Sequence, residues 1–140
     1  MRIVLDSSVV VAALRSRYGA SNALLQLVAT GKLTPVCSPP LFLEYEDVLL
    51  RPEQRLVHGL SEEQIEKFLA ALAGWIEPVE VHFRWRPQTT DPGDEMVLEA
   101  ALNGKADALV THNMHDFAAA GIRFGLAVMT PRELLERLRK

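Results

Sequence analysis

Hydrophobic and polar residues change their spacing within the first part of the chain. Residues 3–5 are consecutive apolar residues, which favours a strand buried on both faces of a parallel sheet. Over residues 9–14 apolar side chains recur at helical spacing, so we expect a helix whose first free amides are accepted by Ser7 or Ser8. Asp6 therefore lies at the carboxyl end of a buried strand, where open α/β sheets bind their ligands.

The rest of the chain alternates between the two spacings. Helices are predicted over residues 21–28, 38–50, 61–73, 94–102 and 132–139, and strands over 33–37, 79–81, 108–110 and 126–129. Residues 52–59 are interpreted as an irregular connection, 84–92 as a loop, and 114–120 as a short turn or helix. This order predicts an α/β fold with three layers, α/β/α, around a mostly parallel sheet of about five strands. With neither a repeat nor a linker, a single domain over 1–140 is the simplest organisation.

Composition narrows the class of protein. A chain of 140 residues that is 49% hydrophobic can bury a core, which excludes disorder. Cys37 is the only cysteine, so we expect a small buried side chain, a reducing compartment and a cytoplasmic location. Asp6 interrupts the first apolar run too early for a signal peptide, and no run reaches the roughly 18 apolar residues of a membrane span. A net charge of −3 argues against binding nucleic acid through overall positive charge.

Four carboxylates fall where this fold would bring the chain to one edge of the sheet: Asp6, Glu44, Asp94 and Asp116. Each has an ordinary alternative, as a helix cap, a turn former or a solvated helix residue. Together they would repel one another strongly unless a cation lay among them. Oxygen ligands without cysteine favour Mg²⁺ or Mn²⁺, and an ion held in this way can activate water against a phosphodiester.

The segments LDSSVVVAAL, SPPLFLEYEDVL, DPGDEMVLEAAL and LVTHNMHDF resemble, in this order, the four motifs of PIN domains. Their spacing is most similar to that of the VapC-like toxins of bacterial toxin-antitoxin pairs. The resemblance extends from Ile3 to Leu135. No single motif is specific, whereas their order and the threonine, asparagine and aspartate of the last one are.

The resemblance implies a metal-dependent ribonuclease with Mg²⁺ or Mn²⁺ as cofactor. It assigns the catalytic and metal-binding roles to Asp6, Glu44, Asp94 and Asp116, and supporting polar roles to Ser7, Ser8, Thr111 and Asn113. It also implies an RNA substrate, a cognate antitoxin protein and a homodimer, with no membrane association. Asp91 and Glu95 flank the third acid, so the metal ligand within DPGDE stays open between them and Asp94.

Two further sets of residues lie near these motifs. His112 and His115 have a spacing that could bind zinc, but no cysteine accompanies them, so we interpret them as surface or groove-lining side chains. Two interpretations are open for Trp85, which lies between two arginines: a stacking face for a nucleic-acid base, or a half-buried side chain in a solvated rim. Two roles are open for a set of arginines, as contacts to the phosphates of a nucleic acid or as part of a solvated rim: Arg15, Arg17, Arg51, Arg55, Arg84 and Arg86.

Two other functions were weighed. A receiver-type signalling domain needs an acidic pair early in the chain and a lysine after a later strand, and the sequence has neither. The second alternative is a catalytically silent PIN-fold module that binds RNA or a protein partner. Retention of all four acids weighs against that loss of catalysis.

Overall fold

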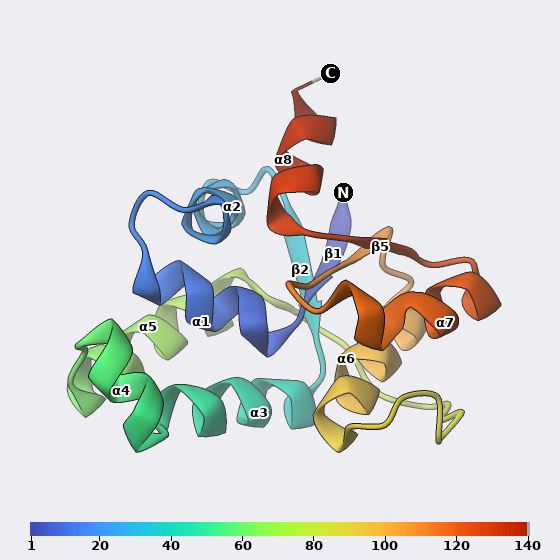
Figure 1. Ribbon diagram of the computed structural model, residues 1–140, viewed down its shortest axis with the longest axis horizontal. Coiled ribbons are helices and arrows are strands. Elements are labelled where there is room, and N and C mark those ends of the chain that lie inside the picture. Colours follow the sequence, from blue (N-terminus) through green and yellow to red (C-terminus); the bar gives the residue numbers. More distant parts are fainter. Residues whose placement is uncertain (140) are drawn as a thin grey trace.

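The computed structural model describes residues 1–139 (Figure 1). Within them, parallel strands form a central sheet and helices connect them. The elements are β1 (Arg2–Leu5), α1 (Ser7–Arg15), α2 (Ala20–Ala29), β2 (Thr34–Cys37), α3 (Pro39–Leu50), α4 (Pro52–His58), α5 (Glu62–Trp75), β3 (Glu77–Pro78), α6 (Pro92–Asn103), β4 (Ala108–Val110), α7 (Met114–Phe124), β5 (Ala127–Met129) and α8 (Pro131–Leu138). The expected α/β class is confirmed.

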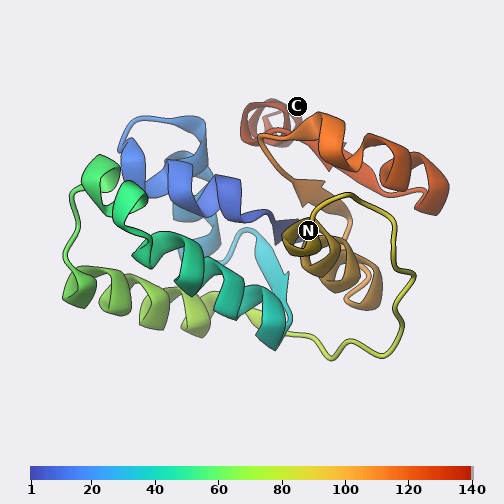
Figure 2. The same ribbon diagram turned by 60° about the horizontal axis from the view of Figure 1, so that its bottom comes forward.

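The five strands are ordered β3-β2-β1-β4-β5, and every pairing is parallel. Leu5 pairs with Val110, so the carboxyl ends of β1 and β4 meet at the centre of the sheet. Helices lie on both faces, and α6 packs across β1, β2 and β4 (Figure 2). The order of the strands therefore places the residues that follow β1 and β4 side by side.

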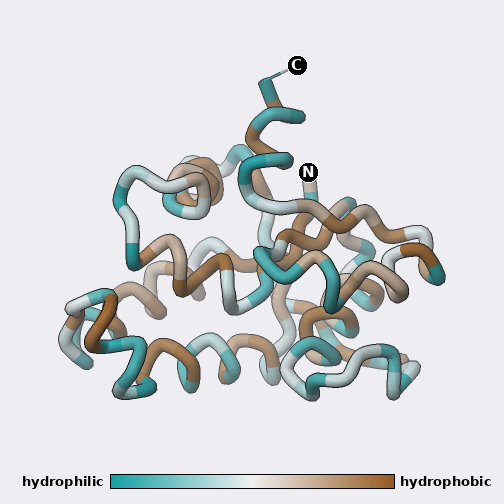
Figure 3. Tube along the Cα trace, in the orientation of Figure 1, coloured by the Kyte–Doolittle hydropathy of each residue, from teal (hydrophilic) through white to brown (hydrophobic). Residues whose placement is uncertain are grey.

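The hydrophobic core is built around the central strands. Residues 3–5 and 108–110 are at most 1% exposed, as expected for strands covered on both faces. In the hydropathy-coloured trace, hydrophobic stretches lie in the interior and hydrophilic ones at the outer turns (Figure 3). Cys37 lies in this core, where burial raises the pKa of its thiol to about 12. None of the helices within residues 1–139 has the length and apolar character needed to cross a membrane.

Side-chain caps fix where several helices begin. The hydroxyl of Ser38 accepts from the backbone N–H of Leu41 at the start of α3. Ser61 forms a reciprocal capping box with Gln64 at the start of α5, and Thr130 does the same in α8. These caps satisfy backbone donors that a helix leaves free, and so confirm the predicted starts of α3, α5 and α8.

Three predicted elements differ from the structure. Residues 52–59 are not irregular but contain α4, which begins at Pro52 and ends at Gly59 in the left-handed conformation. The strand expected over 79–81 lies earlier, at Glu77–Pro78, because the backbone of Val36 and Cys37 pairs there. The segment after β4, expected to be a short turn or helix over 114–120, is a helix, and α7 continues to Phe124.

Candidate active site

Asp6 is a buried carboxylate held at the carboxyl end of β1. Asp6 is only 3% exposed, and its backbone N–H donates to the carbonyl of Val110 over 2.9 Å. The hydroxyls of Ser8 and Thr111 both donate to Oδ2 of Asp6, each over 2.7 Å. Both bonds go to one oxygen, which leaves Oδ1 for another partner.

Neither Ser7 nor Ser8 caps α1, although one of them was expected to do so. The structure shows no side-chain capping bond at the start of α1, and Asp6 occupies the cap position. Ser8 instead directs its hydroxyl to Asp6 and accepts from the backbone N–H of His112 over 3.2 Å. The buried carboxylate needs donors, and Ser8 supplies one from the first turn of α1. Ser7 is half-buried beside it.

The turn after β4 carries the next acid. Thr111 is fully buried, and its Oγ1 accepts from the backbone N–H of Asn113 over 2.9 Å. Asn113 is the first residue before α7, without a side-chain capping bond, and Asp116 lies in the first turn of that helix. Thr111 therefore links Asp6, through hydrogen bonds, to the turn that leads into α7, and Asp116 lies in the first turn of that helix.

Glu44 and the start of α6 approach each other closely at Gly93. Asp91 caps α6, because its Oδ1 accepts from the backbone N–H of Gly93 over 2.7 Å. A Cβ atom at Gly93 would lie 3.0 Å from that oxygen and 3.1 Å from Oε1 of Glu44. The absence of a side chain at Gly93 thus lets the carboxylate of α3 lie against the first turn of α6.

Asp94 experiences the charges of the other acids. Burial is the largest cause that raises its pKa, to about 7, and the negative charges of Asp6, Asp91, Asp116 and Glu44 raise it further. A carboxyl responds in this way when like charges share its surroundings. The structure thus brings all four sequence-predicted acids to one edge of the sheet.

The pKa of Glu44 is also raised. Burial is the main cause, opposed by Arg51 and reinforced by Asp47, Asp91 and Asp6. Two acids from different helices, Glu44 and Asp94, therefore hold their protons more tightly than a solvated carboxyl does. A cation among these oxygens would relieve the repulsion that raises both pKa values.

The acids of the DPGDE motif have separate contacts. Glu95 is 5% exposed and turned toward the preceding loop, where Oε1 accepts from the backbone N–H groups of Gln88 and Thr89 over 2.7 and 2.9 Å. Asp91 caps the helix, and Asp94 faces the other acids. Buried Glu99, which was missed from the sequence, forms a two-bond pair with Arg86. Its spacing of four residues from Glu95 was the available signal.

The donor set fits a hard divalent cation in its chemistry. Carboxylate oxygens are the ligands that Mg²⁺ and Mn²⁺ prefer, and burial together with the negative charges of neighbouring acids raises the pKa values of Glu44 and Asp94. Within residues 1–139, no group of three or more His, Cys, Asp or Glu side chains is arranged so that it could hold a metal ion. The acids therefore lie at one edge of the sheet, but within residues 1–139 no three of their side chains are close enough to form a metal site as they stand.

The neighbouring histidines and arginines are mostly engaged elsewhere. Nε2 of His112 lies 2.8 Å from the hydroxyl of Ser21, and His115 is exposed. Arg51, the residue directly after α3, forms an ion pair with Asp47 of that helix, and Arg86 forms one with Glu99. His112 lies at the rim of the acidic site, because its backbone N–H donates to Ser8, which bonds Asp6. Arg51 and Arg86 form ion pairs with other residues.

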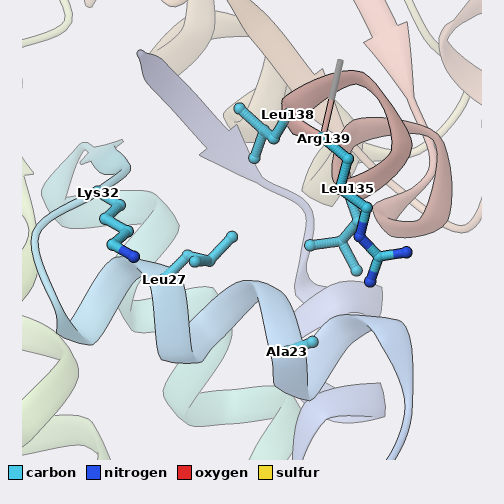
Figure 4. Close-up of a pocket in the computed structure, with 6 residues that line it drawn as sticks. All are labelled: Ala23, Leu27, Lys32, Leu135, Leu138 and Arg139. Carbon is cyan, nitrogen blue, oxygen red and sulfur yellow. The ribbon is translucent and has the colours of Figure 1, made fainter.

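A cavity of about 430 Å³ lies away from the acids, between α2 and α8 (Figure 4). Its lining consists of Ala23, Leu27, Lys32, Leu135, Leu138 and Arg139. This lining is apolar and cationic, so the cavity belongs to a different part of the molecule from the carboxylates.

Comparison with known proteins decides the family. A family model described as PIN domain matches residues 2–115, which is more than half of the chain. The chain belongs to the PIN domain family. A solved structure similar to this PIN domain is that of FitAB bound to an IR36 DNA fragment, with a TM-score of 0.56 and 20% sequence identity over 92% of this chain and 94% of that one. At this identity the likeness supports the fold. No curated protein matches the chain.

Proposed function

We propose that this PIN domain is a metal-dependent ribonuclease that hydrolyses RNA phosphodiester bonds. The carboxylates of Asp6, Glu44, Asp94 and Asp116 would hold Mg²⁺ or Mn²⁺. The observations that support the proposal are the approach of the Glu44 carboxylate to the first turn of α6 at Gly93, and the raised pKa of Asp94, to which burial and the negative charges of Asp6, Glu44 and Asp116 contribute. Repulsion of this kind is costly to the fold, and a metal-binding function gives a reason for it.

The residues of the chain have distinct tasks in this proposal. A bound divalent ion supplies activation of water and stabilisation of the charge on the phosphate. Ser8 and Thr111 fix Asp6 by their hydrogen bonds to Oδ2, which leaves Oδ1 to bind the ion. Ser7 and Asn113 would support the arrangement from the first turns of α1 and α7. Gly93 allows Glu44 to approach Asp94, whose proton is released when positive charge arrives.

We further propose that the chain is the toxin of a toxin-antitoxin pair and forms a homodimer in the cytoplasm. The four sequence motifs support this assignment through their resemblance to those of VapC-like toxins. Large hydrophobic side chains on the surface, among them Leu43, Leu56 and Ile122, are 63%, 88% and 86% exposed and could be covered by protein partners. Light scattering of the purified protein, alone and with a co-expressed antitoxin, tests the assembly.

One observation favours a second candidate function. Since residues 1–139 contain no closed group of three metal ligands, a catalytically silent PIN-fold module that binds RNA or a protein is the alternative. The two functions differ in one assay. The ribonuclease cleaves single-stranded RNA, loses activity in EDTA, regains it with Mn²⁺ or Mg²⁺, and is inactive as Asp6→Asn. The silent module leaves the RNA intact under all of these conditions, and cleavage that survives EDTA rejects the metal mechanism.

A further inference from the structure

The loop between β3 and α6 carries an exposed aromatic surface. The rings of Phe83 and Trp85 have centroids 5.9 Å apart, and those of Trp85 and Phe124 are 5.6 Å apart. Phe83 is 64% exposed and Trp85 38%, although both are large aromatic residues. We call these three residues the aromatic surface. They join the loop to the last residue of α7.

This loop is held in place although its sequence is polar and contains proline. Asn103 bonds the backbone of residues 82 and 83, donating to the carbonyl of Phe83 and accepting from both N–H groups, each over 3.0 Å. Arg86 forms two bonds to buried Glu99, of 2.7 and 2.8 Å. Glu95 accepts from the backbone of residues 88 and 89. Two buried carboxylates are thus used to position a loop whose aromatic side chains face solvent.

Positive charge borders the aromatic surface. The guanidinium carbon of Arg123 lies 5.4 Å from the centroid of the Phe124 ring, and its Nη1 donates to Oε1 of Gln88 over 3.0 Å. Arg84 stands between Phe83 and Trp85 in the sequence, and its side chain is exposed. Within the part of the chain that the structure describes, neither Arg84 nor Arg123 forms an ion pair. Aromatic faces bordered by such guanidinium groups match the bases and phosphates of a single strand.

The aromatic surface is connected to the acidic site. Gln88 contacts Arg123 through its side chain and Glu95 through its backbone, and Glu95 is adjacent to Asp94. Asp116 and Phe124 lie at the two ends of α7, about 12 Å apart along the helix axis. One strand of nucleic acid can therefore contact both places.

We propose that the aromatic surface binds an unpaired base of single-stranded RNA while Arg84 and Arg123 contact the flanking phosphates. This proposal rests on the proposed ribonuclease function and adds a substrate-positioning site outside the carboxylates. A duplex hides the faces of its bases, so the site selects unpaired RNA. Because the net charge is −3, RNA binding depends on a local site of this kind or on a bound metal ion rather than on overall positive charge.

The test measures binding without cleavage. A fluorescently labelled single-stranded RNA of about eight nucleotides is titrated with protein in EDTA, and anisotropy gives the affinity. Trp85→Ala should weaken binding roughly tenfold, and Trp85→Phe should restore most of it, because phenylalanine retains an aromatic face. Leu56→Ala is the matched control, since Leu56 is 88% exposed on α4, at the opposite side of the molecule (Figure 2). Circular dichroism confirms that each variant is folded.

Two further ligands separate stacking from charge. An abasic strand of the same length should bind the wild type as weakly as the intact strand binds Trp85→Ala. Arg84→Gln should lower affinity for both strands and reduce the salt dependence by about one phosphate contact. Equal binding of intact and abasic strands, no binding of single-stranded RNA, or wild-type affinity in Trp85→Ala overturns the inference. Binding that depends on Trp85 in a protein that cleaves no RNA supports the inference and rejects the proposed function instead.

Discussion

The hydroxyl of Thr111, directly after β4, donates to Oδ2 of Asp6, directly after β1, over 2.7 Å. This bond joins residues that are 105 positions apart in the sequence, and both are buried. It exists because β1 and β4 are parallel neighbours whose carboxyl ends coincide. The bond therefore connects the fold of the central sheet directly to the position of one proposed metal ligand.

Replacing Thr111 tests that connection. Thr111→Val keeps the shape but removes the donor to Asp6 and the acceptor for the N–H of Asn113, so unfolding should become easier by about 1–3 kcal/mol. Urea denaturation measures the change. Thr111→Ser keeps the hydroxyl and should lie much closer to wild type. Equal stability of the valine variant and wild type would mean that the hydrogen bond has no net value.

Asp94 should make stability depend on pH when no metal is added. Its pKa in the folded protein is about 7, above the ordinary value of 3.8, so the folded state binds this proton more tightly than the unfolded chain does. Stability from this group is therefore highest at low pH and falls as pH rises from about 4 to about 7. Asp94→Asn removes this titration and leaves the cap of α6 in place, because that cap is Asp91.

The melting temperature of Asp94→Asn, relative to wild type in EDTA, should thus increase as pH rises through this range. Above pH 7 the variant should melt at the same temperature as wild type or higher, and its gain on adding Mn²⁺ should be smaller. A variant that melts well below wild type at every pH would identify Asp94 as a structural residue.

Glu95 should behave in the opposite way to Asp94. Glu95→Gln weakens the charge-assisted acceptance from the backbone of Gln88 and Thr89, so we expect a loss of about 1–2 kcal/mol in unfolding free energy. Affinity for Mn²⁺, measured by calorimetry, should change less than in Asp94→Asn. A larger loss of metal binding in Glu95→Gln would move the ligand role within DPGDE from Asp94 to Glu95.

The Arg86 and Glu99 pair should contribute to the stability of the loop. Glu99 is 4% exposed, so Arg86→Gln leaves a buried charge without its partner and should cost about 1–2 kcal/mol, reduced by the partial exposure of Arg86. Denaturation of Arg86→Gln, Glu99→Gln and the double variant gives the coupling between them. Additive single effects would show that the pair contributes nothing beyond its separate residues.

The sequence predicted the fold well where hydrophobic spacing is determined by burial. The strands around residues 3–5 and 108–110 are buried on both faces, and the capped starts of α3, α5 and α8 follow local rules. Helix α4 was missed because it has no buried residue and therefore no apolar face to recognise. The short strand β3 was misplaced because its two residues are both exposed and only backbone pairing defines it.

The candidate site was predictable in its acids and less so in its contacts. The positions of Asp6 and Asp116 follow from strand ends, which the sequence pattern locates. Hydrophobic spacing suggests a capping role for Ser7 or Ser8 because the preference of serine for helix starts is local, whereas the actual partner of Ser8 is set by the burial of Asp6. The division of tasks between Asp94 and Glu95 depends on the direction that each faces around α6, and on a loop whose path the sequence does not specify.

Calorimetric titration with Mn²⁺ is the most direct test of the central proposal, that the four carboxylates share one divalent ion. Wild type should bind Mn²⁺, and Asp6→Asn should bind at least roughly tenfold more weakly. Glu66→Gln removes an exposed acid on α5 and should bind as wild type does. Equal Mn²⁺ affinity of wild type and Asp6→Asn would contradict a metal site at this edge of the sheet.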